Sequence, residues 1–117
     1  MRMPEFAIYG STLQIAGSDG PQEIHFKWPI AQVLTVGSIY IVRTEPPPGA
    51  CANQNVHALD HEGRRVWTVS ARNHVYADSP YTNIYLQGDE LVLSNWDGLN
   101  LVVEPETWRE IGATYGR

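Results

Sequence analysis

The chain has 117 residues, a mass of 13.1 kDa and a formal net charge of −5 at pH 7, with 43% hydrophobic and 18% charged residues. This length suits one hydrophobic core, so we expect a single domain over residues 1–117. The acidic balance argues against nucleic acid and membrane surfaces as partners, because such polyanions are usually met by clustered Lys and Arg.

The N-terminal segment, MRMPEFAIYG, lacks an uninterrupted apolar stretch. No later run approaches the roughly 18 apolar residues that a membrane-spanning helix requires. The single cysteine, Cys51, excludes an internal disulfide and is typical of a reducing compartment. These features favour a cytoplasmic protein, and a secreted protein whose signal peptide had been removed would share them.

Short β-rich segments separated by glycine-containing turns make up the first half of the chain. The predicted strands are residues 5–9, 12–16, 23–28, 30–36 and 39–44. Gly10-Ser11 suits a two-residue turn with positive φ at its first position. The stretch Pro46-Pro47-Pro48-Gly49 has few backbone donors, so we expect residues 45–53 to leave the sheet as an exposed excursion.

The second half continues the pattern with two groups of strands. A hairpin is predicted over 55–69, with Gly63 in a three-residue loop followed by a bulge. After a polar connection over 71–81 comes a four-stranded meander, with strands at 82–86, 90–95, 99–104 and 108–111. Asp97-Gly98 predicts a two-residue hairpin inside this meander.

A strand and turn pattern occurs twice, over Gly37–Val69 and again over Gly88–Ile111. Both copies run in the order turn, strand, strand, acidic turn and Trp-bearing strand. Repeated antiparallel hairpins fix the fold class more firmly than a single motif does. We therefore expect an all-β, antiparallel domain of about ten strands, with two blade-like repeats at 37–69 and 88–111.

The second half of the chain resembles the blade repeats of quinoprotein-like β-propellers. In the first copy the resemblance is carried by Asn55, Val56, Ala58, Leu59, Asp60, Gly63 and Trp67. In the second copy it is carried by Trp96, Asp97, Gly98, Leu99, Val102, Glu104, Thr107 and Ile111. The chain is shorter than the roughly four blades of a closed ring. The family's cofactor is therefore not carried over, and a compact barrel, a sandwich or an oligomer is expected to cover the sheet edges.

No motif predicts catalysis, a cofactor or a metal. The histidines His25, His57, His61 and His74 are scattered without the ligand spacing of zinc sites. Asp60 is expected to accept backbone N–H bonds in a turn. Cys51 could act as a nucleophile beside His57 or His74, but it follows a proline-rich loop with no helix N-terminus to lower its pKa, so a passive role is favoured.

Aromatic side chains are the remaining indication of function. Trp67 and Trp108 are expected to fill the core between sheets. Tyr81 and Tyr85 are an even number of residues apart, which predicts one shared strand face, and the following hairpin can bring Trp96 alongside. The predicted binding residues are these three aromatics with a negative rim of Asp78, Asp89 and Asp97.

The sequence therefore predicts a small non-enzymatic binding protein that recognises a protein partner or forms a homo-oligomer. An acidic surface with exposed aromatics suits a basic partner, as in a bacterial inhibitor or immunity-like protein. The alternative is a β-barrel that holds a small molecule in its mouth, lined by the same aromatics. An enzyme that uses Cys51 or the histidines ranks last.

Overall fold

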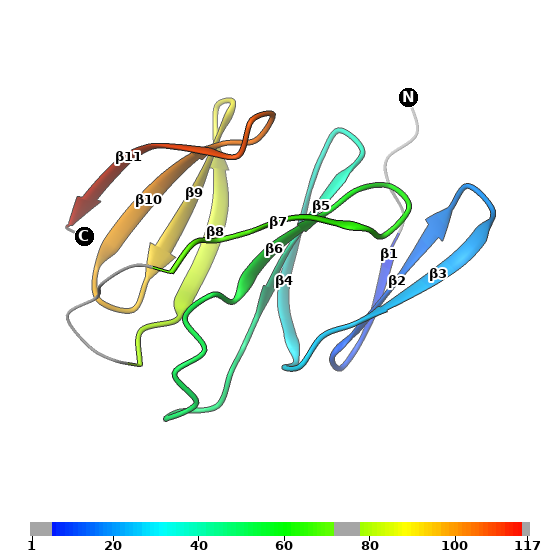
Figure 1. Cartoon of the computed structure of the whole chain (residues 1–117), viewed down its shortest axis with the longest axis horizontal. Coiled ribbons are helices and arrows are strands. Elements are labelled where there is room, and N and C mark those ends of the chain that lie inside the picture. The colour runs from blue at the N-terminus through cyan, green and yellow to red at the C-terminus, as the bar shows by residue number, and fades with distance from the viewer. Residues whose placement is uncertain (1–5, 72–77, 116–117) are drawn as a thin grey trace.

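A computed structural model describes residues 6–71 and 78–115, where eleven strands form three antiparallel sheets (Figure 1). The described residues include no helix and no closed barrel. The prediction of an all-β antiparallel fold is thus confirmed. Instead of a closed barrel, three small sheets lie side by side like the blades of a propeller. Within each sheet, a strand pairs only with the strands next to it in the sequence.

Every sheet is a meander of consecutive strands. The first sheet contains β1 (Phe6–Tyr9), β2 (Thr12–Gly17) and β3 (Gly20–His25). The middle sheet contains β4 (Ile30–Val36), β5 (Ile39–Thr44), β6 (Val56–Leu59) and β7 (Arg65–Thr68). The third sheet contains β8 (Tyr81–Gln87), β9 (Glu90–Asn95), β10 (Leu99–Glu104) and β11 (Arg109–Tyr115).

The tight turns follow the glycines, with one correction. Gly10 begins the predicted two-residue turn between β1 and β2, with φ 60°. Gly63, at φ 84°, ends the predicted three-residue loop between β6 and β7, and the expected bulge follows it. The two-residue hairpin at Asp97-Gly98 was wrong. β9 ends at Asn95 and β10 begins at Leu99, so the loop has three residues, 96–98, and Gly98 takes the left-handed position at φ 93°.

The middle sheet is buried on both faces, which explains the continuous apolar run in β5. Ile41 and Val42 are adjacent and fully buried, although their side chains point to opposite faces. The face toward the first sheet forms a cluster with Leu13, Ile15, Phe26, Tyr40, Val42 and Leu59. The face toward the third sheet forms a cluster with Ile41, Val56, Val69, Tyr81, Ile84, Leu91, Leu93, Leu101 and Val103.

Trp67 and Trp108 lie at the border of the second cluster. Their rings stack at 5.2 Å between centroids and an interplanar angle of 17°. Both are only partly buried, so they cover the core rather than fill it. Trp108 precedes β11 and lies in the turn, at φ 60°, where it was expected to begin the strand.

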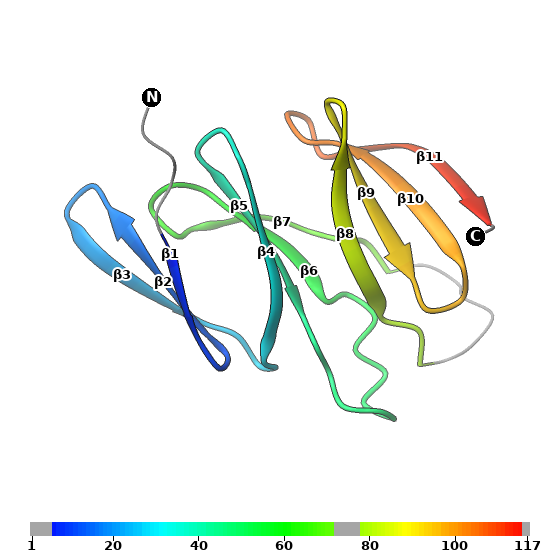
Figure 2. The same ribbon diagram turned by 180° about the vertical axis from the view of Figure 1, so that it is seen from behind.

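Side-chain amides of the middle sheet join it to the edge strand β8 of the third sheet. Asn55 accepts a hydrogen bond from the N–H of Tyr81 and donates one to its carbonyl oxygen, both at 2.9 Å. Gln32 accepts from the N–H of Ile84 at 3.0 Å and donates to its carbonyl oxygen at 3.3 Å. The buried Arg43 donates to Gln32 at 2.6 Å and so orients its amide. Figure 2 shows β4 and β8 as neighbours at this seam.

The first and middle sheets meet at two hairpin turns. Ser18 donates hydrogen bonds from its N–H and its hydroxyl to the carboxylate of Glu62. These bonds lower the pKa of Glu62. The neighbouring Asp60 accepts from the N–H groups of Glu62 and Arg64, both at 2.9 Å, as the turn pattern predicted. Burial raises the pKa of Asp60, but these bonds outweigh it and hold that pKa below its usual value.

Gly63 provides a test of the contact between the first and middle sheets, which we call the first seam. A Cβ at this position would approach Ile24 Cδ1 to 2.9 Å in addition to adopting a positive φ. We expect Gly63→Ala to lower the free energy of unfolding by about 2–3 kcal/mol, from backbone strain and overpacking together. Gly88→Ala is the matched control, since φ is +61° there and nothing lies within 4 Å. It should cost only about 1 kcal/mol in urea unfolding. Equal losses in the two variants would contradict close packing at Gly63.

Asn55 provides a test of the contact between the middle and third sheets, which we call the second seam. Asn55→Ala would leave the buried N–H of Tyr81 without its partner, so we expect a loss of about 2–4 kcal/mol in the free energy of unfolding. The adjacent Gln54→Ala removes an amide that is exposed and donates one bond, to Val69. It should cost about 1 kcal/mol or less. A variant at Asn55 as stable as the one at Gln54 would show that the amide does not hold the sheets together.

Candidate functional site

Trp96 and Tyr85 border a shallow hollow of about 430 Å³ on the third sheet. Trp96 is 62% exposed and Tyr85 is 39% exposed. The hollow is lined by these aromatics together with Thr82, Ser94, Asn95, Gly98 and Asn100. The polar members were not predicted from the sequence. The available signal in the sequence was the alternation of side chains along the two strands that carry Ser94 and Asn100, which the structure pairs in register.

The hairpin that carries Trp96 is held by hydrogen bonds on both sides. The N–H of Trp96 donates to the carbonyl oxygen of Pro80 at 2.9 Å. The buried Asn95 donates to the carbonyl oxygen of Ser79 at 2.9 Å and accepts from the N–H of Asp97 at 3.1 Å. The indole is therefore presented from a backbone that is already ordered.

Tyr81 does not belong to this surface, which corrects the predicted aromatic group. Its side chain is 1% exposed and lies in the core between the middle and third sheets. The reason is a shift of register between Tyr81 and Asn83. Such a bulge inserts one residue and reverses the alternation of faces, so Tyr81 and Tyr85 point to opposite sides.

The three aspartates of the predicted rim are dispersed. Asp97 lies in the Trp96 turn, half-buried, and accepts from the N–H of Leu99 at 2.9 Å. Asp78 is also half-buried and accepts from the N–H of Gly49 at 2.7 Å, which ties down the proline-rich excursion. Asp89 lies beyond the opposite end of the six-residue β9, about 20 Å away at roughly 3.3 Å per residue. Only Asp97 borders Trp96 directly.

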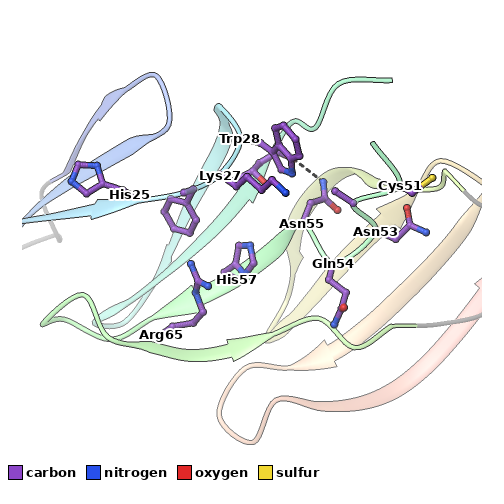
Figure 3. A pocket seen from close by; sticks show the side chains of 12 residues that line it. His25, Lys27, Trp28, Cys51, Asn53, Gln54, Asn55, His57 and Arg65 are labelled. Carbon is purple, nitrogen blue, oxygen red and sulfur yellow. Dashed lines mark hydrogen bonds between the residues drawn. The ribbon is translucent and has the colours of Figure 1, made fainter. Parts of the chain in front are cut away.

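A second hollow, of about 370 Å³, lies where the first sheet leads into the middle sheet (Figure 3). Phe26 stacks on His57 at 5.4 Å, and the guanidinium of Arg65 lies 5.3 Å from the Phe26 ring centre. Lys27 and Trp28 contribute from the segment that connects β3 to β4. Residues 23–28 were predicted from the sequence only as an alternating strand, and the contact of Phe26 with Arg65 depends on tertiary packing that no local pattern reveals.

His57 is the most perturbed histidine of the described part of the chain. Burial, with a smaller contribution from the charge of Arg65, lowers its pKa from 6.5 to about 4. One ring nitrogen, Nδ1, lies 2.9 Å from the hydroxyl oxygen of Thr68. Cys51 also lines this hollow and is exposed, and its sulfur points away from His57 in Figure 3. His74, the other suggested base, lies outside the described residues.

Within residues 6–71 and 78–115, no three His, Cys, Asp or Glu side chains are grouped so that they could hold a metal ion. The same residues contain no helix long and apolar enough to cross a membrane.

The family comparison matches residues 3–115 to a domain of unknown function, DUF7957. The chain belongs to this family. A search of curated proteins found no significant match. Among solved structures, this DUF7957 domain is similar to apo AztD from Citrobacter koseri, with a TM-score of 0.69 and 12% identity. It is also similar to BamB from Moraxella catarrhalis, with a TM-score of 0.55 and 14% identity.

These similarities concern the fold. The DUF7957 chain is covered to 97% by AztD and to 94% by BamB, but it spans only 31% and 39% of those chains. Both are β-propeller proteins, so the predicted resemblance to propeller blades is confirmed at the level of structure.

The perturbation of His57 can be measured by NMR titration of its ring protons, which should give a midpoint near pH 4. Because the folded pKa lies below the unfolded value of 6.5, protonation favours the unfolded chain, and this contribution to stability is lost as the pH falls from 6.5 toward 4. In Arg65→Gln the midpoint should rise, while remaining below 6.5 because burial is the larger cause. A wild-type midpoint near 6.5 would contradict the burial of this ring.

Proposed function

We propose that this DUF7957 domain is a non-enzymatic binding protein that recognises another protein through the outer face of its third sheet. The observation that carries the proposal is the exposed indole of Trp96 on an ordered hairpin, beside Tyr85. Large aromatics of this kind supply contact area at low cost in conformational entropy.

The order of the Trp96 hairpin supports this proposal. A side chain whose backbone is already fixed loses little freedom on binding, so more of its contact energy contributes to affinity. The bonds from Trp96 to Pro80 and from Asn95 to Ser79 supply this order before any partner arrives. A tryptophan needed only for the core would be expected to pack against a buried apolar cluster, as Trp67 and Trp108 do at its border.

The position of the face also supports it. Among the described elements, the middle sheet packs on one face of the third sheet, and no strand packs on the other. In propellers, neighbouring blades cover such faces, so this face lies where another protein surface would pack. Ser94 and Asn100, which are hydrogen-bonded to each other at 2.9 Å, add polar groups that favour recognition over simple apolar burial.

A comparison of Trp96→Ala with Tyr9→Ala tests this proposal. Both side chains are 62% exposed, but Tyr9 lies at the end of β1 in the first sheet. Proteins from the native host that are captured by the wild-type domain and by Tyr9→Ala, but not by Trp96→Ala, are the candidate partners. For one such purified partner, calorimetry should give an affinity loss of about 2 kcal/mol or more for Trp96→Ala.

Two further measurements complete the test. Sedimentation of the domain alone establishes whether the partner is a second copy, in which case Trp96→Ala should shift the oligomer toward the monomer. Thermal melting of both variants should remain close to wild type, because neither side chain is buried. If Trp96→Ala melts much earlier while partner affinity is unchanged, Trp96 has a structural role and the proposal is wrong.

A further inference from the structure

The hollow between the first and middle sheets is lined by positively charged side chains, although the protein as a whole is acidic. Its lining includes Lys27 and Arg65 but no Asp or Glu, in a chain with 13 acidic and 8 basic residues. Within residues 6–71 and 78–115, neither cation forms a salt bridge with a carboxylate. Two cations that border one concavity focus a positive potential there and attract an anion.

Aromatic rings hold both cations in place. The guanidinium of Arg65 lies 5.3 Å from the centre of Phe26, and the ammonium of Lys27 lies 5.0 Å from the centre of the Trp28 ring. Cation–π contacts of this kind orient a charged group without neutralising it. The charge of each side chain therefore stays available to a ligand.

The walls of the hollow suit a planar ligand. Phe26 and His57 are stacked with an interplanar angle of 30°, and Trp28 adds a second large ring. With its pKa near 4, His57 is neutral at pH 7 and acts as a ring rather than as a third cation. The volume of about 370 Å³ falls within the range of small-ligand sites.

We propose that this hollow binds a small organic anion with an aromatic ring. Arg65 would hold a carboxylate, whose two oxygens match the paired N–H donors of the guanidinium, and Lys27 would add a second positive charge. The ring of the ligand would pack against Trp28 and His57, which are partly exposed, beside the buried Phe26. This site is separate from the Trp96 face and does not depend on the function proposed for that face.

Calorimetric titration of the full chain with 2-naphthoate provides the test. We expect saturable binding at one site per chain, with 2-naphthamide, the neutral analogue of the same shape, binding more weakly by roughly tenfold or more. Inorganic phosphate should also bind more weakly, because it lacks the ring. Equal affinity for the naphthoate and the naphthamide would overturn the anion requirement, and equal affinity for phosphate would overturn the aromatic one.

Variants locate the binding. Lys27→Gln and Arg65→Gln should each weaken naphthoate binding by roughly tenfold, since a charge-assisted contact is lost. Arg109→Gln removes the same charge from an exposed position on β11, outside the hollow, and should leave the affinity unchanged. Lys27 is exposed, so its variant tests the site even if Arg65→Gln folds poorly. Unaltered affinity in Lys27→Gln, or ligand-induced NMR shifts that avoid Phe26 and His57, would show that the site is wrong.

Discussion

The pairing of two side-chain amides with the backbone of β8 is the constraint on which the rest of this structure depends. An edge strand exposes N–H and C=O groups that must find partners when they are buried. Asn55 and Gln32 supply those partners to Tyr81 and Ile84, and each amide imitates one residue of a neighbouring strand. The third sheet can therefore pack against the middle one without a continuous ladder between them. The apolar cluster behind this seam provides the free energy of burial, while the two amides fix the alignment of β8 against the middle sheet.

The two hollows lie in different places because the middle sheet is covered on both faces. A ligand can therefore reach only the outer face of a neighbouring sheet, a seam between two sheets, or a turn. On the third sheet the outer face presents Trp96, held by backbone bonds. At the first seam, the segment between β3 and β4 must cross from one sheet to the next. This crossing brings Lys27 and Trp28 near Arg65 of β7, which is remote in sequence.

Local chemistry made much of the fold predictable, because strands and turns depend on nearby residues. Glycines at positive φ, such as Gly10 and Gly63, could be assigned from the sequence alone. The predictions that failed depended on a shift in strand register or on contacts between residues far apart in the sequence. One bulge near Asn83 reversed the face of Tyr81 and removed it from the predicted site. The seam contacts of Asn55 could not be anticipated, because a polar residue before a strand looks the same whether it caps a turn or pairs with another sheet.

Two hollows of the molecule differ in the charge of the side chains that line them. Four carboxylates, those of Asp89, Glu90, Glu104 and Glu106, line a hollow of about 560 Å³ at the turn end of the third sheet. The cations Lys27 and Arg65 border a hollow at the first seam. At physiological ionic strength the field of an exposed charge decays over about 8 Å, whereas the molecule extends over 44 Å along its longest axis. The net charge of −5 therefore does not by itself exclude an anion from this hollow, whose lining includes Lys27 and Arg65 and no Asp or Glu.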